Sequence, residues 1–204
     1  MIAPCDAKVV LLASASVTRA QILQNAGVAF EVDHARIDEG AIKIACQAGA
    51  VPVEEAAVRL AEAKAIEVAS RHPNRLVIGA DQLLVGEAGW CDKPQTRQAA
   101  RATLESLRGG EHRLVSGVVV AIDATVVWTY VDVATLSMRD YSASFIDWYL
   151  DSMQPADLQV VGACRLEGLG VQALARIEGD YFTILGLPLL PLLDFLRSRG
   201  IVPR

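Results

Sequence analysis

The chain has 204 residues, of which 52% are hydrophobic and 21% charged. This length and composition are typical of a globular protein with one large domain or two small halves, and they exclude a disordered chain. The net charge of −5 comes without a basic tail or stripe. We therefore expect no nucleic-acid polymer as partner, while a nucleotide remains open.

A membrane protein and a zinc protein are also disfavoured. The longest apolar runs are too short for a membrane span, and the N-terminus lacks the basic-then-apolar form of a secretory signal. The cysteines show no CxxC spacing, so we expect reduced thiols and a cytoplasmic protein. They are Cys5, Cys46, Cys91 and Cys164.

The first half of the chain alternates strands and helices. Short apolar runs predict strands and longer amphipathic runs predict helices, one of them closed by Gly27. The expected elements are strand 9–13, helix 17–25, strand 29–33, helix 53–70 and strand 76–85.

The second half begins with a turn at Gly86 and Gly89 and then changes its pattern. β-Branched runs joined at Asp123-Ala124 predict an antiparallel hairpin. The expected elements are helix 96–107, strands 115–122 and 125–136, helix 142–150 and helix 188–199. Residues 1–204 therefore predict one α/β domain with a mixed sheet, which can form two lobes about a cleft.

Asp81 is the one carboxylate in the apolar run 76–85. A charge in a buried strand is costly unless another group pairs with it or it takes part in chemistry. A buried salt bridge or a turn cap would explain Asp81 as well as catalysis would.

Ser14, Ser16 and Arg19 surround the start of the first helix. A solvated Arg19 is one interpretation of this pattern. The other is that two hydroxyls, a guanidinium and free backbone N–H groups bind a phosphate. The glycines of a dinucleotide or P-loop fingerprint are missing.

Lys64 lies on the apolar face of the helix 53–70, between Leu60 and Val68. It either extends to solvent along its own stem or presents an ammonium to an anion. Lys93 before Pro94 supplies another cation. Further acidic groups follow at Asp38-Glu39 and at Glu167, which lies in a glycine-flanked loop.

The ordered set of these segments resembles the Maf family over nearly the whole chain. The segments are Leu12–Arg19, Asp38-Glu39, Ala63-Lys64-Ala65, Gly79–Gln82, Asp92-Lys93-Pro94, His112 with Ser116-Gly117-Val118, Glu167–Gly170 and Gly186–Leu189. The resemblance implies a fold similar to the inosine triphosphate pyrophosphatases, with an elongated mixed sheet, flanking helices and a central cleft. It also implies hydrolysis of nucleoside triphosphates to the monophosphate and pyrophosphate with a divalent cation, Mg²⁺ or Mn²⁺, in a protein that is commonly a homodimer.

The family's site residues carry over position by position. Asp81 matches the catalytic base, and Glu39 matches its partner carboxylate, both of which would also hold the metal. The phosphate-binding groups correspond to Ser14, Ser16, Arg19, Lys64 and Lys93.

Three departures from the family's usual pattern bear on the substrate. The Ser-Pro-Arg-Arg segment reads Ser16-Val17-Thr18-Arg19, so one phosphate contact is lost or passes to a lysine. Gln82 and Glu167 stand where the branch acting on thymidine and uridine triphosphates tends to carry Thr and Gln. In all three respects the chain is similar to the 7-methyl-GTP pyrophosphatase branch.

Elementary chemistry is consistent with this set of residues. Cations neutralise a triphosphate and orient it for in-line attack, while carboxylates become useful once a hard cation bridges them to phosphate oxygens. A nucleotide-binding regulator of cell division without turnover would not need Asp81, and a nucleotidyltransferase would need an acceptor lobe. His112 is expected on the surface at a strand entry or, alternatively, as a hydrogen-bond donor behind the site.

Overall fold

The computed structural model of the chain describes residues 9–154 and 160–203. Its mixed α/β sheet confirms the expected fold class. The strand order is β2-β1-β3-β5-β6-β7, with β4 paired to β3, and β1 runs parallel to both β2 and β3. The strands are β1 (Val10–Ala13), β2 (Phe30–Val32), β3 (Val77–Gly86), β4 (Gly89–Cys91), β5 (Glu111–Ile122), β6 (Thr125–Met138) and β7 (Leu174–Glu178).

The described chain divides into two compact units. The first comprises residues 9–81, 116–132 and 181–203, and the second comprises residues 82–115, 133–154 and 160–180. Strands β3, β5 and β6 each contribute residues to both units. A central cleft between lobes stays a prediction.

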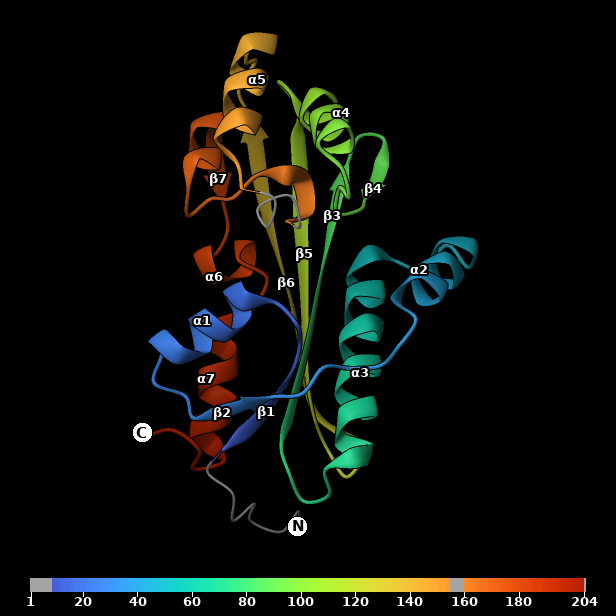
Figure 1. The fold of residues 1–204 in the computed structure, drawn as a ribbon. Helices are drawn as coiled ribbons and strands as arrows, with labels where there is room; N and C mark the ends of the chain where they lie inside the picture. The colour runs from blue at the N-terminus through green and yellow to red at the C-terminus, as the bar shows by residue number, and fades with distance from the viewer. Residues whose placement is uncertain (1–8, 155–159, 204) are drawn as a thin grey trace. The chain divides into compact units, whose positions relative to one another are not determined.

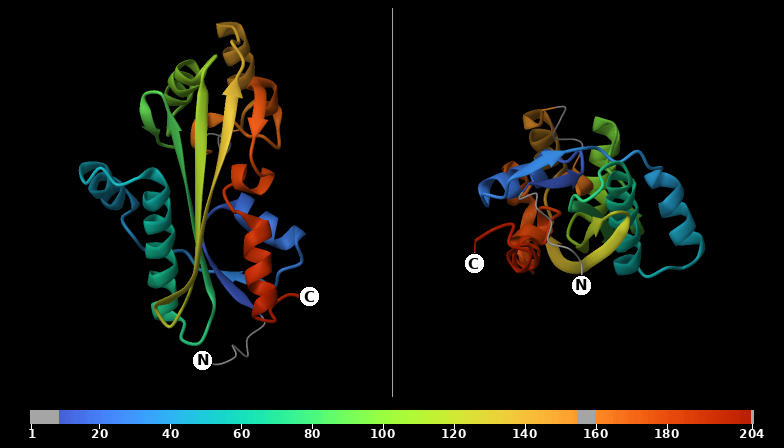
Figure 2. Two further views of the ribbon diagram at one scale, coloured as in Figure 1. Left: turned by 180° about the vertical axis from the view of Figure 1, so that it is seen from behind. Right: turned by 90° about the horizontal axis from the view of Figure 1, so that it is seen from below.

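Helices cover both faces of the sheet in the first unit. They are α1 (Val17–Asn25), α2 (Glu39–Ala48), α3 (Val53–Arg71), α6 (Tyr181–Ile184) and α7 (Leu189–Ser198). Alternate residues of β1 point to opposite faces, as a strand requires. Val10 and Leu12 pack with α1 and α7, whereas Leu11 and Ala13 pack with α3. Figure 1 shows this layering, and Figure 2 shows it from behind.

Helix α3 approaches the sheet unusually closely because two glycines face its backbone. A Cβ on Gly79 would lie 2.1 Å from the Ala61 carbonyl oxygen, and one on Gly117 would lie 2.7 Å from that of Ala57. The facing positions of α3 are alanines, whose small side chains permit this approach. The short distance between α3 and the sheet is therefore set by glycines on the sheet and alanines on the helix.

We expect Gly79→Ala to destabilise the protein, because the added methyl group meets backbone atoms that cannot rotate away. Overpacking of this kind costs about 1–3 kcal/mol or more. Chemical denaturation measures the change in the free energy of unfolding. The matched control is Gly110→Ala, whose Cβ would have its nearest neighbour at 3.6 Å. Equal stability of both variants would contradict the close approach.

The second unit contains α4 (Arg97–Leu107) and α5 (Ala143–Ser152), which pack against each other. Thr96 caps the first of these helices, and Ser142 caps the second, as its sequence predicts. The Tyr141 hydroxyl donates a 2.6 Å hydrogen bond to the Leu104 carbonyl oxygen. Two short 3-10 helices, Val161–Ala163 and Leu169–Ala173, precede β7.

Three of the four cysteines lie within the described residues. Cys46, Cys91 and Cys164 are free thiols, whereas Cys5 lies outside the described residues. Among the described helices, none has the length and apolar character that crossing a membrane requires.

Several elements were not expected from the sequence. Helix α2 was missed, although Asp38 caps it by accepting a hydrogen bond from the Ala41 N–H; Cys46 is its one buried residue. Strand β4 has three residues and β7 five. Both are too short for alternation to distinguish them from turns.

His112 is not a surface residue, contrary to one of the two expectations for it. At the entry of β5 its side chain is only 4% exposed, and its Nδ1 atom has no hydrogen-bond partner among the described residues. Burial lowers the pKa of His112 from 6.5 to about 4, because the charged imidazolium loses its hydration. The imidazole is therefore neutral in the folded state at physiological pH.

This burial predicts a pH-dependent stability. Since the unfolded state binds the proton first, the free energy of unfolding should fall as the pH drops from 6.5 to about 4 and level off below. The contribution is on the order of 3 kcal/mol at most. His112→Phe should remove this part of the slope, measured by urea denaturation at several pH values. His34→Phe, at an exposed histidine, is the control and should leave the slope unchanged.

Candidate active site

Asp81 forms a buried ion pair with Lys64. The Asp81 Oδ1 atom lies 2.5 Å from the Lys64 ammonium nitrogen, and the two residues are 6% and 7% exposed. Asp81 belongs to β3 and Lys64 to the buried face of α3, as its position between Leu60 and Val68 predicts. The buried salt bridge considered for Asp81 is thus present, and Lys64 does not extend to solvent.

Glu39 reaches the same ammonium. Its Oε1 atom lies 2.9 Å from the Lys64 nitrogen, and its side chain remains 48% exposed. Glu39 is the first residue of α2, where Asp38 caps the helix by accepting a 2.9 Å hydrogen bond from the Ala41 N–H. Elements β3, α2 and α3 therefore bring two carboxylates onto one cation.

Arg19 lies beside this group and is 8% exposed. Its guanidinium donates hydrogen bonds to the Ser14 hydroxyl (3.1 Å), the Ala80 carbonyl (2.9 Å) and the Gly186 carbonyl (2.7 Å). Burial lowers the pKa of Arg19, while the charges of Asp81 and Glu39 act in the opposite direction. The guanidinium thus shares the electrostatic field of the two carboxylates.

The start of α1 is built as the sequence predicts. The Ser16 hydroxyl caps the helix by accepting a hydrogen bond of 3.3 Å from the Arg19 N–H, and the Ser14 hydroxyl accepts one of 3.3 Å from the Ser16 N–H. No sequence signal points to Ala80 or Gly186 as partners of Arg19, because they contribute backbone carbonyls that every residue has. That Ser14, Ser16 and Arg19 bind phosphate stays a prediction.

The carboxylate pair is chemically suited to a hard divalent cation. Asp81 and Glu39 already converge on a positive charge, and carboxylate oxygens are the ligands that Mg²⁺ and Mn²⁺ prefer. Within residues 9–154 and 160–203 no group of three or more His, Cys, Asp or Glu side chains forms a complete metal cage. Mg²⁺ is commonly bound by one or two carboxylates, and phosphates of the substrate complete its coordination shell.

The remaining predicted site residues belong to the second unit. Gln82 is half-buried in β3, directly after Asp81. Lys93 is exposed in the connection between β4 and α4, and Glu167 is exposed in the turn between the two 3-10 helices. The turn is tight, because a Cβ on Gly170 would lie 2.6 Å from backbone atoms of Arg165. Their part in substrate binding stays a prediction.

Comparison with known proteins agrees with the resemblance seen in the sequence. A nucleoside triphosphate pyrophosphatase of Paramagnetospirillum magneticum is 50% identical over 194 residues, covering 95% of this chain and 100% of the relative. One from Caulobacter vibrioides is 48% identical, covering 94% and 96%. A 7-methyl-GTP pyrophosphatase of Brucella abortus is 44% identical, also covering 94% and 96%. Residues 9–199 match the family profile described as Maf-like protein, and the chain therefore belongs to the Maf family.

Proposed function

We propose that this protein hydrolyses nucleoside triphosphates to the monophosphate and pyrophosphate by attack of water on the α-phosphate. The observation that carries the proposal is the Asp81–Lys64–Glu39 cluster, in which Asp81 and Lys64 are buried. The relatives of the chain are named nucleoside triphosphate pyrophosphatases. The expected cytoplasmic location and homodimer belong to the same proposal.

Each residue of the cluster has a distinct task in this proposal. Asp81 accepts the proton of the attacking water, a role that suits a carboxylate held in one orientation by a short contact. Lys64 holds both carboxylates and can turn its ammonium toward a phosphate oxygen. Arg19 and Ser14 are hydrogen-bonded to each other, and Arg19 is also bonded to Ala80 within β3; they present a cation and a hydroxyl to the triphosphate.

A divalent cation, Mg²⁺ or Mn²⁺, is part of the proposal. Asp81 and Glu39 would hold it, and it would supply Lewis-acid stabilisation of charge on the phosphate oxygens. Arg19 and the three charged side chains of the cluster comprise two cations and two carboxylates, whose charges balance. The charge of a bound triphosphate therefore calls for added positive charge, which the cation and Lys93 would provide.

The decisive experiment is product analysis with standard and modified triphosphates and Mg²⁺ or Mn²⁺. Release of pyrophosphate with the monophosphate supports hydrolysis at the α-phosphorus. Release of inorganic phosphate with the diphosphate would refute it. Binding without turnover would favour a regulator, and transfer of the nucleotidyl group to a hydroxyl would favour a nucleotidyltransferase.

Asp81→Asn should abolish turnover while leaving triphosphate binding largely intact. The amide keeps the shape of the side chain and cannot take the proton, and loss of a general base costs about 10²–10⁴ in rate. Steady-state kinetics and equilibrium binding of a non-hydrolysable triphosphate separate the two effects. A variant with near-native pyrophosphate release would show that Asp81 is only a partner of Lys64.

We further propose that Gln82 and Glu167 select the base and favour a purine, with methylated guanine as the leading candidate. A carboxylate accepts hydrogen bonds from the N–H edge of guanine, whereas thymine flanks its single N–H with two carbonyl acceptors. One relative's name, 7-methyl-GTP pyrophosphatase, supports this preference. Mismatched groups in a binding site commonly separate substrates by roughly 1–3 kcal/mol each.

The double variant Gln82→Thr, Glu167→Gln should shift the ratio of kcat/KM values toward thymidine and uridine triphosphates. Comparing 7-methyl-GTP with thymidine triphosphate on both proteins measures the shift. If Glu167 instead contacts the metal or phosphates, the variant should lose activity on all bases alike. A wild-type protein that prefers thymidine triphosphate would refute the assignment.

A further inference from the structure

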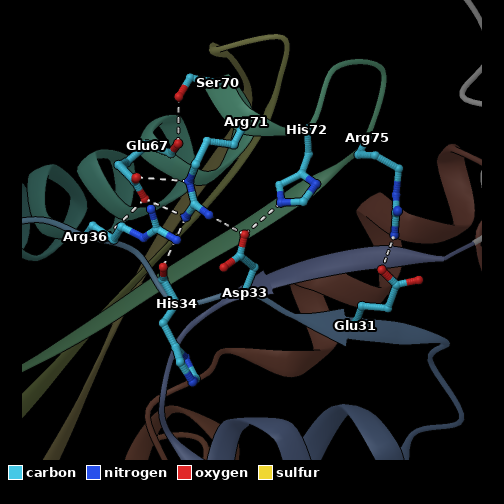
Figure 3. Close-up of polar contacts among 9 residues, drawn as sticks. All are labelled: Glu31, Asp33, His34, Arg36, Glu67, Ser70, Arg71, His72 and Arg75. Carbon is cyan, nitrogen blue, oxygen red and sulfur yellow. Dashed lines mark hydrogen bonds and ion pairs between the residues drawn. The ribbon is translucent and has the colours of Figure 1, made fainter.

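Arg71, the last residue of α3, holds the connection that leads from β2 to Glu39. Its Nη1 atom lies 2.5 Å from the Asp33 Oδ2 atom, and its Nη2 atom donates a 3.1 Å hydrogen bond to the His34 carbonyl. The His72 ring nitrogen Nε2 lies 2.7 Å from the same Asp33 oxygen. Figure 3 shows these groups converging on Asp33, with the His34 side chain directed away.

Glu67, one turn earlier on α3, completes the arrangement. Its carboxylate accepts hydrogen bonds from Arg71 through Nε (3.0 Å) and Nη2 (2.9 Å). It also accepts a 3.0 Å hydrogen bond from the Arg36 backbone N–H. We call Glu67 and Arg71 the clamp. It fixes the connection at Asp33, His34 and Arg36.

The clamp and the ammonium of the candidate site lie on one side of α3. Lys64, Glu67 and Arg71 are spaced at i, i+3 and i+7, which places them on the same face of a helix. The connection that the clamp holds continues directly into Asp38 and Glu39. One helix therefore holds this part of the chain at both ends, through the clamp at 33–36 and through Lys64 at Glu39.

Such a tether matters because α2 has little hydrophobic anchoring of its own. Cys46 is its one buried residue, and Ile44 is 68% exposed. The ion pair of Glu39 with Lys64 and the hold on the preceding connection therefore add to the few apolar contacts between α2 and α3. The clamp is also less exposed than the other Glu–Arg pair on this helix. Its side chains are 24% and 26% exposed, against 52% and 50% for Glu55 and Arg59.

The charges of the clamp persist at neutral pH. A hydrogen bond from Arg71 is the main cause that lowers the pKa of Glu67, and one from His72 is the main cause that lowers the pKa of Asp33. Both groups are therefore carboxylates under the conditions in which a triphosphate would bind.

We infer that the Glu67–Arg71 clamp is a positioning device that sets the location of Glu39 relative to Lys64 and Asp81, and so supports turnover without contacting the substrate. This inference rests on the proposed hydrolysis. Misplacement of a reacting group by about 1 Å can cost 10²-fold in rate. Loss of the clamp should therefore lower kcat more than it raises KM.

The test compares Arg71→Met with Arg197→Met, which breaks an exposed ion pair with Asp194 one turn away on α7. Arg71→Met should reduce kcat at least about tenfold, whereas Arg197→Met should leave it unchanged. Hydrogen exchange of the backbone amides of residues 33–42, measured without substrate, should accelerate in Arg71→Met alone. Arg71→Lys keeps one cationic contact and should recover part of the rate.

A double-mutant cycle with Glu39→Gln distinguishes positioning from general destabilisation. If the clamp acts through Glu39, Arg71→Met should have almost no further effect on kcat once Glu39 is replaced. Additive losses, or unchanged exchange in residues 33–42, would overturn the inference. A wild-type protein that hydrolyses no triphosphate would instead refute the proposed function, and the exchange measurement would still decide whether the clamp holds this segment.

Discussion

The ammonium of Lys64 between two carboxylates is the interaction on which the candidate site depends. Moving a single charged group from water into a protein interior costs several kcal/mol, and a partner at close range offsets this cost. Lys64 and Asp81 are both almost fully buried and in contact. Replacing either partner by a neutral residue would remove the closest compensation for the other buried charge, so the pair also constrains how α3 meets β3.

The way α3 packs on the sheet makes that constraint possible. Gly79 and Gly117 let the helix backbone come close, and alanines line its facing side. The same helix then carries Lys64 toward Asp81 and carries Glu67 and Arg71 toward the connection after β2. The small residues of α3 thus set its distance from the sheet, and its charged residues hold the connection after β2.

Strong local signals made much of this fold predictable. The apolar β1, the capped α1, the long α3, α4 and the last helix were expected at nearly their observed bounds. Helix α2 and strands β4 and β7 were not expected, and each of them buries at most one side chain. The burial of His112 was missed, since a lone histidine carries no sign of which neighbours will cover it.

The site was foreseen as a set of residues but not as a set of contacts. Asp81 and Lys64 were each recognised as charges in apolar surroundings, which is a local property of the sequence. Their pairing depends on tertiary packing across 17 positions. The bonds from Arg19 to the Ala80 and Gly186 carbonyls leave no trace in residue identity.

The boundary between the two compact units falls between Asp81 and Gln82, consecutive residues of one strand. All the side chains assigned to the ionic cluster lie in the first unit, and both residues assigned to base choice lie in the second. If Gln82 and Glu167 choose the base as proposed, mutations that change base preference can accumulate in sequence segments that contribute nothing to the ionic cluster. Relatives with different nucleotide preferences could in this way diverge while they inherit the same ionic cluster.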